Sequence, residues 1–266
     1  MIIDRKARLI KVESWKDYHL LSLESPEISR KARPGQFLMI KVSEGTQPLL
    51  RRPFSLHNVE GSIVEIFFQV VGEGTRLLAK KKPGDTLDVL GPLGNGFSLR
   101  PDFGSQEVFC IGGGRGIAPI YFLARELQKT GVRPVVFYGG RTETDLPLKT
   151  RFEIAGCELL ISTDDGSAGF SGLVTALVEK ELERRRPAFL FACGPEPMME
   201  TLAEICQRHN LKGEFSLESI MGCGFGACWG CVKKIKKSQE AGYLKICQEG
   251  PVFAWEEIVW QEVENG

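Results

Sequence analysis

The chain has 266 residues, and its 34 lysines and arginines balance 34 aspartates and glutamates. This balance argues against a broad nucleic-acid-binding surface, which requires an excess of positive charge. A chain of this length is long for one hydrophobic core, so two or three domains are expected. No run of residues approaches the roughly 20 apolar residues of a membrane-spanning helix, and the N-terminus lacks the apolar core of a signal peptide. We therefore expect a soluble, cytoplasmic protein without membrane contact.

Residues 1–101 are expected to form an antiparallel β-barrel. Alternating or β-branched runs recur at short intervals, and turn signals such as Lys82-Pro83-Gly84-Asp85 separate them. Six or so short strands at this spacing predict a small closed barrel, with one helix around Gly74–Lys81. The clearest runs are Ala7–Val12, Tyr18–Leu23, Gln36–Val42, Ser62–Val71 and Thr86–Leu90.

A candidate phosphate- and flavin-binding motif lies within the predicted barrel. In Arg52-Pro53-Phe54-Ser55, the arginine is held near a strand end and can pair with a pyrophosphate, while the serine can donate to a flavin nitrogen. The segment Gln69-Val70-Val71-Gly72-Glu73-Gly74-Thr75 ends a strand and opens a helix, whose N-terminus suits a phosphate. The alternative is an ordinary barrel strand with an exposed basic end.

Residues 102–213 have a different period, in which short buried strands alternate with helical segments. This alternation predicts βαβ units and a parallel, doubly wound sheet, the fold of many NAD-binding domains. The predicted strands are Val108–Ile111, Val135–Tyr138, Leu159–Ser162 and Phe189–Ala192, and the predicted helices are 117–128, 173–185 and 196–209.

The glycine turn of this region, Gly112-Gly113-Gly114-Arg115-Gly116, follows a predicted strand and precedes a helix. That context is typical of a dinucleotide-phosphate site, although the G-x-G-x-x-G fingerprint is absent. Pro119 fits the first helical turn, where its missing N–H is not needed. A tight turn without a ligand is the alternative.

Two further positions follow predicted parallel strands, where ligands bind in open α/β sheets. Cys193 and Gly194 end the last strand; Cys193 is either a small buried residue or a neighbour of the nicotinamide. Arg141 follows the second strand and is either a nucleotide-phosphate contact or a surface arginine.

Four cysteines near the C-terminus carry the most specific pattern. Cys223, Cys228, Cys231 and Cys247 have the spacing C-x4-C-x2-C plus a distant fourth cysteine, as in plant-type ferredoxins that hold a [2Fe–2S] cluster. The interleaved glycines, Gly222, Gly224, Gly226 and Gly230, are expected to supply positive φ angles and N–H groups directed at the sulfurs. A structural zinc site or two disulfides are the alternatives. We predict a small cluster-binding domain over residues 214–266, irregular after about Gly213.

The remaining reactive residues suggest no substrate chemistry. Cys110, Cys157, Cys193 and Cys206 stand singly among apolar or helical residues, which indicates buried, reduced thiols. None of His19, His57 and His209 stands in a cysteine or serine constellation, so no catalytic residue is assigned. The run Lys233–Lys237 is either a solvated hairpin edge or a docking patch for an acidic partner.

The succession of RPFS, GGGRGIAP and CGPEPMM resembles the ferredoxin–NADP reductase family. The cysteine loop is similar to that of the electron-transfer subunits of NAD-linked class 1B dihydroorotate dehydrogenases, a likeness that extends over residues 5–260. The resemblance implies that FAD contacts Arg52, Pro53, Phe54, Ser55, Gln69, Val70, Val71, Gly74 and Thr75. It likewise implies a nicotinamide dinucleotide at Gly112, Gly113, Gly114, Gly116, Pro119, Cys193 and Gly194, and the cluster on the four cysteines.

The same resemblance implies a function. Electrons would pass from the FMN of a separate dihydroorotate dehydrogenase catalytic subunit through the [2Fe–2S] cluster and FAD to NAD+, in pyrimidine (UMP) biosynthesis. FAD suits the central place because it exchanges both single electrons and hydride. A heterotetramer of two such chains with two catalytic subunits is implied as well.

Two positions depart from the family pattern. Arg115 stands where relatives commonly carry an aliphatic residue, which leaves the choice between NAD and NADP open. Phe54 stands where many reductases have a tyrosine, so one hydroxyl that could contact FAD is missing.

Two other functions fit part of the pattern. The chain could be the small subunit of an NAD(P)H:ferredoxin oxidoreductase or sulfide dehydrogenase, although relatives of that type tend to replace one cluster cysteine. A zinc-stapled nucleotide-binding adaptor without redox activity is the alternative from another class.

Overall fold

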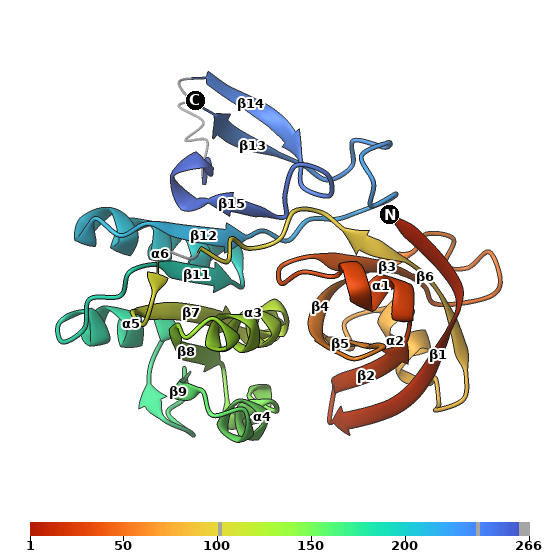
Figure 1. Ribbon diagram of the computed structural model, residues 1–266, viewed down its shortest axis with the longest axis horizontal. Helices are drawn as coiled ribbons and strands as arrows, with labels where there is room; N and C mark the ends of the chain where they lie inside the picture. The colour runs from red at the N-terminus through yellow and green to blue at the C-terminus, as the bar shows by residue number, and fades with distance from the viewer. Residues whose placement is uncertain (101–102, 238–239, 261–266) are drawn as a thin grey trace.

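The computed structural model describes residues 1–100, 103–237 and 240–260. A barrel, a helix-covered sheet and a small cysteine-bearing lobe lie side by side, with the lobe above the junction of the other two in Figure 1. This arrangement confirms the predicted fold class. The predicted domain boundaries stay predictions, and residues 101–102, 238–239 and 261–266 lie outside the described part of the chain.

The N-terminal barrel is closed and antiparallel, with the strand order β1-β2-β5-β4-β3-β6. Its alternating sequence turns residues such as Leu21, Leu38 and Ile66 into the interior, where they are fully buried. The elements are β1 (Ile2–Trp15), β2 (Tyr18–Glu24), α1 (Pro26–Lys31), β3 (Phe37–Lys41), β4 (Arg52–Glu60), β5 (Ile63–Gln69), α2 (Glu73–Ala79) and β6 (Thr86–Leu93). The sequence did not predict α1, because six residues are too few to show a helical period.

The second body is a seven-stranded sheet in the order β10-β9-β8-β7-β11-β12-β15. All neighbouring strands are parallel except β15, which pairs antiparallel with β12. The strands are β7 (Glu107–Gly113), β8 (Arg133–Gly140), β9 (Glu158–Thr163), β10 (Phe170–Ser171), β11 (Leu190–Cys193), β12 (Gly213–Ser216) and β15 (Val252–Ala254).

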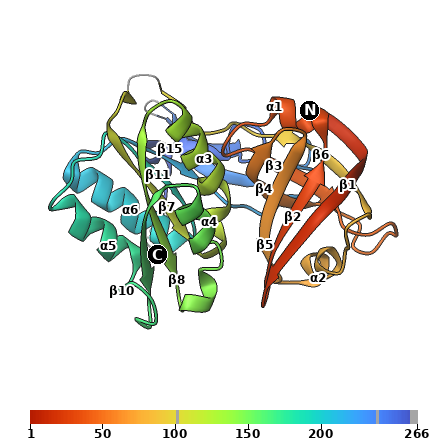
Figure 2. The same cartoon turned by 60° about the horizontal axis from the view of Figure 1, so that its bottom comes forward.

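Helices cover both faces of this sheet, because β7 is apolar on both sides. Val108 and Cys110 pack with α3 (Ile117–Lys129) and α4 (Lys149–Ile154), which lie on the barrel side. Phe109 and Ile111 pack with α5 (Val174–Leu182) and α6 (Glu196–His209). Figure 2 shows these two helices on the other side of the sheet from α3 and α4. Short 3-10 turns are η2 (Gly114–Gly116), η3 (Glu143–Asp145) and η4 (Trp255–Glu257). No helix in the described ranges is long and apolar enough to cross a bilayer.

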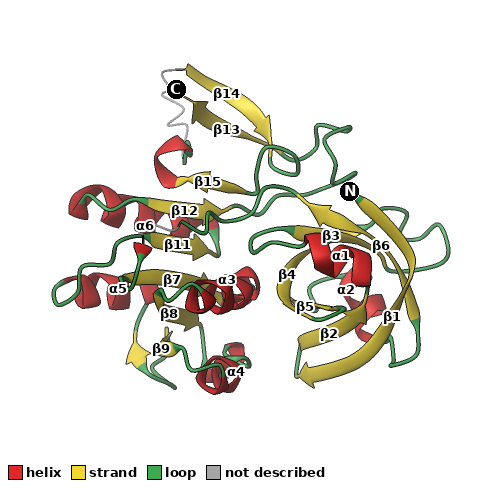
Figure 3. Cartoon of the chain, in the orientation of Figure 1, coloured by secondary structure: helices red, strands yellow, loops and turns green. Residues whose placement is uncertain are grey.

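The C-terminal segment belongs partly to the sheet. After β12 the chain forms a long loop and the hairpin of β13 (Val232–Lys237) and β14 (Glu240–Lys245), visible in Figure 3, and then returns to the sheet as β15. The expectation of an irregular segment after Gly213 is therefore too simple. Strands of four and three residues, like β12 and β15, are too short to show a period in sequence.

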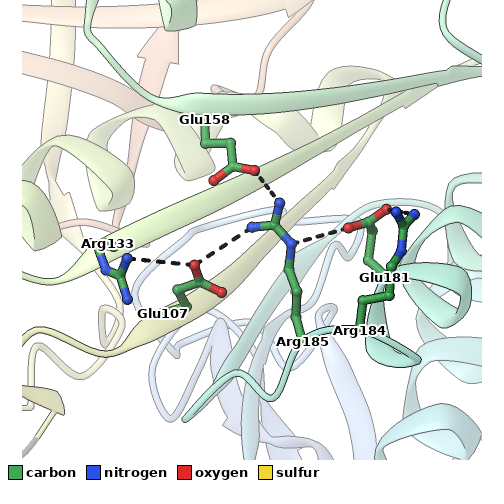
Figure 4. A network of polar contacts seen from close by, with 6 residues as sticks. All are labelled: Glu107, Arg133, Glu158, Glu181, Arg184 and Arg185. Atoms are coloured by element: carbon green, nitrogen blue, oxygen red, sulfur yellow. Dashed lines mark hydrogen bonds and ion pairs between the residues drawn. The ribbon is translucent and has the colours of Figure 1, made fainter.

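An ion-pair network joins the strands at the edge of the sheet opposite the glycine turn (Figure 4). Arg185 Nε lies 3.1 Å from Glu181 and Nη1 lies 3.7 Å from Glu107, which also pairs with Arg133 at 3.8 Å. The members are Glu107, Arg133, Glu158, Glu181, Arg184 and Arg185. Because β7, β8 and β9 begin here, the network fixes α5 and the strand starts while leaving the carboxyl edge free for ligands.

Candidate functional site

The first candidate cavity, of about 390 Å3, opens beside barrel strands β4 and β5 and is called the barrel cavity below. Its walls include the whole predicted flavin motif Arg52–Ser55, together with Gln69, Val71 and Thr75. Cys193 closes it from the sheet side. The cavity does not include Val70 or Gly74 in its lining.

Gly74 has a structural role, because its lack of a side chain lets Arg52 approach the start of α2. A Cβ built on Gly74 would lie only 3.0 Å from Arg52 Nε, so a larger residue would push the guanidinium away. Arg52 Nη1 donates to the Leu50 carbonyl at 2.6 Å, and Thr75 Oγ1 accepts the N–H groups of Val71 and Gly72 at 2.9 and 3.0 Å. An arginine fork thus lies beside a helix start, an arrangement that suits a diphosphate.

The second candidate cavity, of about 500 Å3, lies at the carboxyl edge of the parallel strands and is called the sheet-edge cavity below. Gly113 and Gly114 line it, as do the turn after β8 and the start of α5. This is the position at which open α/β sheets bind ligands. Its lining combines apolar residues with charged side chains of both signs, among which Arg115 and Arg141 can contact the phosphates of an extended ligand.

The other predicted turn residues shape this cavity without lining it. A Cβ on Gly112 would lie 2.7 Å from the Ile117 Cα, and one on Gly116 would lie 2.3 Å from the Cys193 carbonyl oxygen. Gly194 is equally crowded by Met198 Cε at 2.4 Å, and Pro119 is buried in the first turns of α3. These residues permit the close packing of turn, helix and β11.

Cys193 and Arg141 take distinct positions. Cys193 is only 2% exposed but lines the barrel cavity, and burial raises the pKa of its thiol well above the usual range. The thiol is therefore neutral at this wall. Arg141 lines the sheet-edge cavity, its side chain is 80% exposed, and it lies 3.8 Å from Asp145.

The two cavities meet at residues that line both of them, namely Gln69, Arg115 and Glu218. The Arg115 Nη2 lies 3.0 Å from Glu218 Oε2. A ligand in one cavity can therefore come close to a ligand in the other along a path that passes this ion pair.

The four predicted cluster cysteines gather in one lobe as two pairs. The thiols of Cys223 and Cys228 contact each other, as do those of Cys231 and Cys247. Within the described ranges no three Cys, His, Asp or Glu side chains surround a single-ion site. Two pairs of sulfurs match the needs of a dinuclear [2Fe–2S] cluster, in which each iron takes two thiolates.

Backbone N–H groups point at all four sulfurs. Gly226 donates to Cys247 Sγ at 3.1 Å, Ala227 to Cys223 Sγ at 3.3 Å and Gly230 to Cys228 Sγ at 3.5 Å. The Cys247 N–H donates to Cys231 Sγ at 3.4 Å. Burial raises the pKa of Cys223, but backbone N–H groups outweigh it and lower the pKa to about 6. Burial and the neighbouring Cys231 thiol instead raise the pKa of Cys247 to about 12. The N–H groups directed at all four sulfurs, and not the thiol pKa values by themselves, therefore fit the predicted cluster.

The expected roles of the interleaved glycines are only half right. Gly224 and Gly226 have φ angles of +82° and +88°, whereas Gly222 and Gly230 do not have positive φ. The third left-handed residue of the loop is Trp229, at φ +57°. Gly222 is small for another reason, since a Cβ there would lie 3.2 Å from Cys228 Sγ.

The cluster lobe is continuous with the barrel cavity. Residues 216–221 line that cavity, and Cys223 follows two positions later in the chain. The loop also touches the barrel, because a Cβ on Gly224 would lie 2.4 Å from Met39 Cγ. A cluster on these cysteines and a ligand in the barrel cavity would therefore be near neighbours.

The lysines of the run 233–237 lie on β13, and the side chain of Lys237 lies outside the described part. Lys233 Nζ pairs with Glu196 at 2.6 Å, which ties the hairpin to the start of α6. Lys236 is exposed. The choice between a solvated edge and a docking patch stays a prediction.

Sequence reasoning missed several residues of the site. Tyr18 donates to Asp145 Oδ1 at 2.9 Å across the sheet-edge cavity, and Asp164 and Glu218 contribute further carboxylates to its lining. The position of Asp164 directly after β9 could have marked it, since strand ends at the carboxyl edge carry ligands. No comparable signal exists for Tyr18 or Glu218.

Two family profiles match the chain. One is described as the iron–sulfur cluster binding domain of dihydroorotate dehydrogenase B and matches residues 218–259. The other is described as the oxidoreductase NAD-binding domain and matches residues 110–204. Both fall on the regions in which the cysteine lobe and the sheet-edge cavity are found.

Full-length relatives agree with the profiles. The chain is 37% identical to the dihydroorotate dehydrogenase B (NAD(+)) electron transfer subunit of Desulforamulus reducens over 98% of this chain and 99% of that protein. It is 43% identical to the subunit of the same name from Bacillus caldolyticus, over 90% of this chain and 91% of that one. A solved structure described as an NADH-dependent reduced ferredoxin-NADP oxidoreductase covers 97% of this chain and 91% of its own, with 31% identity and a TM-score of 0.83.

Proposed function

The chain belongs to the family of dihydroorotate dehydrogenase B (NAD+) electron transfer subunits, and on that premise we propose that it carries electrons from a catalytic subunit to NAD+. It is an NAD-linked flavin and iron–sulfur oxidoreductase subunit that acts in pyrimidine biosynthesis. Its cofactors are FAD and a [2Fe–2S] cluster, with NAD as the co-substrate.

The observation that carries this function is the continuity of the three candidate sites. Residues 216–221 line the barrel cavity, Glu218 among them lines the sheet-edge cavity too, and the cysteine loop begins at the next turn. Electron and hydride transfer both require neighbouring sites. One segment of chain brings these sites together.

The residues of each site have separable tasks. When bound, FAD exchanges hydride with a nicotinamide and single electrons with an iron–sulfur cluster. We assign Arg52 and the start of α2 to its diphosphate and Ser55 to its flavin ring, since these residues line the barrel cavity together with Cys193. Because Cys193 is buried and its thiol pKa is raised, it acts as a neutral wall and not as a nucleophile.

The sheet-edge cavity is assigned to the dinucleotide. Gly113 and Gly114 allow its phosphates to approach the backbone, while Gly112, Gly116, Pro119 and Gly194 maintain the shape of the turn. The four cysteines are assigned to the two irons as the pairs Cys223–Cys228 and Cys231–Cys247. The N–H groups directed at their sulfurs stabilise the reduced cluster and so tune its potential.

The partner is a catalytic subunit, as the name of the relatives implies. We propose that this subunit holds FMN, oxidises dihydroorotate and assembles with the present chain as a 2+2 heterotetramer in the cytoplasm. The alternative partner is a subunit of a ferredoxin-linked oxidoreductase, since the solved structure at 31% identity comes from such an enzyme. Purification from the native host, with identification of the accompanying polypeptide, decides between the two.

The cofactor assignment is tested on anaerobically purified protein. We expect about two irons and one FAD per chain, with a paramagnetic signal after dithionite reduction. Cys228→Ser should remove the iron and the signal but leave the FAD. Cys110→Ser, which changes a buried thiol of β7 outside the loop, should retain both the iron and the FAD. Zinc without iron in the parent protein would refute the relay.

A further inference from the structure

One ion pair, Arg115–Glu218, lies where the two cavities meet, and Gln69 lines both cavities beside it. Arg115 donates through Nη2 and Nε to the same oxygen of Glu218, at 3.0 and 3.4 Å. The side chains are 49% and 46% exposed, so both are reachable from solvent. Each residue lines both cavities.

The backbone after Arg115 is tightly packed, whereas its side chain is half exposed. Gly114 before it has a φ of +53°, and Gly116 after it packs so tightly that a Cβ would lie 2.3 Å from the Cys193 carbonyl oxygen. Packing at Gly116 restrains the loop, so the half-exposed guanidinium is the part of this turn best able to change its partner.

The charges of the sheet-edge cavity give that movement a reason. Its lining holds three carboxylates, Asp145, Asp164 and Glu218, against two guanidiniums, Arg115 and Arg141. Each guanidinium already has a carboxylate within 4.0 Å. A dinucleotide brings a pyrophosphate with two more negative charges, so its binding is favoured when a guanidinium turns from its carboxylate to the phosphates.

Of the two, Arg115 is the better placed to be released. The reason is its position: Arg115 lies within the glycine turn to which the dinucleotide phosphates are assigned, whereas Arg141 follows β8. Its half-exposed ion pair with Glu218 is also weak, because water screens it. A doubly charged pyrophosphate is a stronger partner for a guanidinium than one carboxylate.

We propose that Arg115 exchanges anionic partners: it holds Glu218 in the dinucleotide-free protein and moves to the pyrophosphate when a dinucleotide binds. The exchange removes the ion pair from the place where the cavities meet and leaves the Glu218 carboxylate unpaired there. Dinucleotide binding is thus coupled to the loss of the ion pair that lies between the two cavities. This inference depends on the proposed dinucleotide site.

The test measures equilibrium binding of ADP-ribose, which has the pyrophosphate but no nicotinamide, to the FAD- and cluster-loaded chain by titration calorimetry. Arg115→Leu should weaken binding about tenfold or more, through loss of a charge-assisted phosphate contact. Glu218→Gln should tighten binding roughly two- to fivefold, since the competing carboxylate charge is gone. In the double variant Arg115→Leu/Glu218→Gln, the affinity for ADP-ribose should be no higher than in Arg115→Leu alone.

The pair Arg8–Glu24 on the barrel is a matched control. Arg8 Nη2 and Nε lie 3.0 and 3.2 Å from the same oxygen of Glu24, and the two side chains are 60% and 39% exposed. Arg8→Leu and Glu24→Gln should leave the affinity unchanged, and the circular dichroism spectrum of every variant reports on folding.

Three outcomes would overturn the exchange. Unaltered binding by Arg115→Leu would show that the guanidinium does not take the pyrophosphate. An equal gain from Glu218→Gln with and without Arg115 would reduce the effect to simple repulsion between anions. Failure of the parent protein to bind ADP-ribose at all would reject the dinucleotide site itself, and the exchange with it.

Discussion

His57 Nδ1 donates a hydrogen bond to the Ala118 carbonyl oxygen at 2.9 Å and so joins barrel strand β4 to helix α3 of the sheet. A carbonyl oxygen only accepts, so the proton of the neutral ring is on Nδ1. The ring is fully buried and stacks on Tyr121 with ring centroids 4.7 Å apart. Strand β4 begins with the flavin motif and α3 follows the glycine turn, so this bond connects the elements that carry both cofactor sites.

The first prediction concerns the response of this contact to acid. Burial, aided by the charge of Arg151, lowers the pKa of His57 from 6.5 to about 3. Since the folded pKa is the lower one, the neutral ring contributes its full stability above pH about 6.5 and loses it progressively toward pH about 3. Over that window the free energy of unfolding should fall by about 1.4 kcal/mol per pH unit on account of this residue.

His57→Gln keeps an amide that can donate to Ala118 but removes the titrating ring. Denaturant unfolding at several pH values should therefore show a shallower decline for the variant than for the parent. Parallel pH profiles would mean that His57 does not report the acid sensitivity of the domain contact.

The second prediction concerns an ion pair between the barrel and the sheet body. Arg151 of α4 donates to Glu65 of β5, which is 8% exposed and also accepts from Ser22 Oγ at 3.1 Å. Arg151→Met would leave the Glu65 carboxylate buried without its cation. We expect a loss of about 2–3 kcal/mol in the free energy of unfolding.

The double variant Arg151→Met/Glu65→Gln supplies the control, because it removes the unpaired charge. Its stability should lie between those of the parent and of Arg151→Met. If the double variant is less stable than Arg151→Met, desolvation of the Glu65 carboxylate is not the cause of the loss.

Two adjacent arginines allow a sharp test of the flavin site. Arg52 lies against Gly74 in the barrel cavity, whereas Arg51 pairs with Asp88 at 2.8 Å. Arg52→Ala should weaken FAD binding about tenfold or more, since one charge-assisted phosphate contact is worth roughly 1.5–3 kcal/mol. Arg51→Ala should retain FAD. Fluorescence titration of FAD into the apoprotein measures both, and equal affinities would contradict the assignment of Arg52.

The last prediction concerns the cluster loop. Gly226 has a φ of +88°, and a Cβ there would lie 2.1 Å from Gln248 Oε1. Gly226→Ala should distort the N–H contact with Cys247 Sγ and lower the iron content per chain. Gly242→Ala, where no atom lies within 4 Å of the added Cβ, should keep its iron. Full iron occupancy in Gly226→Ala would show that the loop tolerates another backbone.

Local patterns were sufficient wherever function depends on residues close together in the chain. The spacing of Cys223, Cys228 and Cys231, the motif Arg52–Ser55 and the turn Gly112–Gly116 could each be recognised from a short window of sequence. Strand and helix periods indicated the barrel and the parallel sheet for the same reason, since periodicity is a local property. Short elements such as α1 and β15 escaped because they span too few residues to repeat a pattern.

The contacts between the bodies were beyond such reasoning. Tyr18 and Asp145 are 127 positions apart, Arg115 and Glu218 are 103 apart, and His57 and Ala118 are 61 apart. Nothing in the spacing of these residues relates them, because their meeting depends on how the barrel packs against α3 and how the last segment returns across both. The amino-acid order therefore specified which cofactors the chain can hold, and the packing of its parts set their adjacency and the ion pair that lies between two of them.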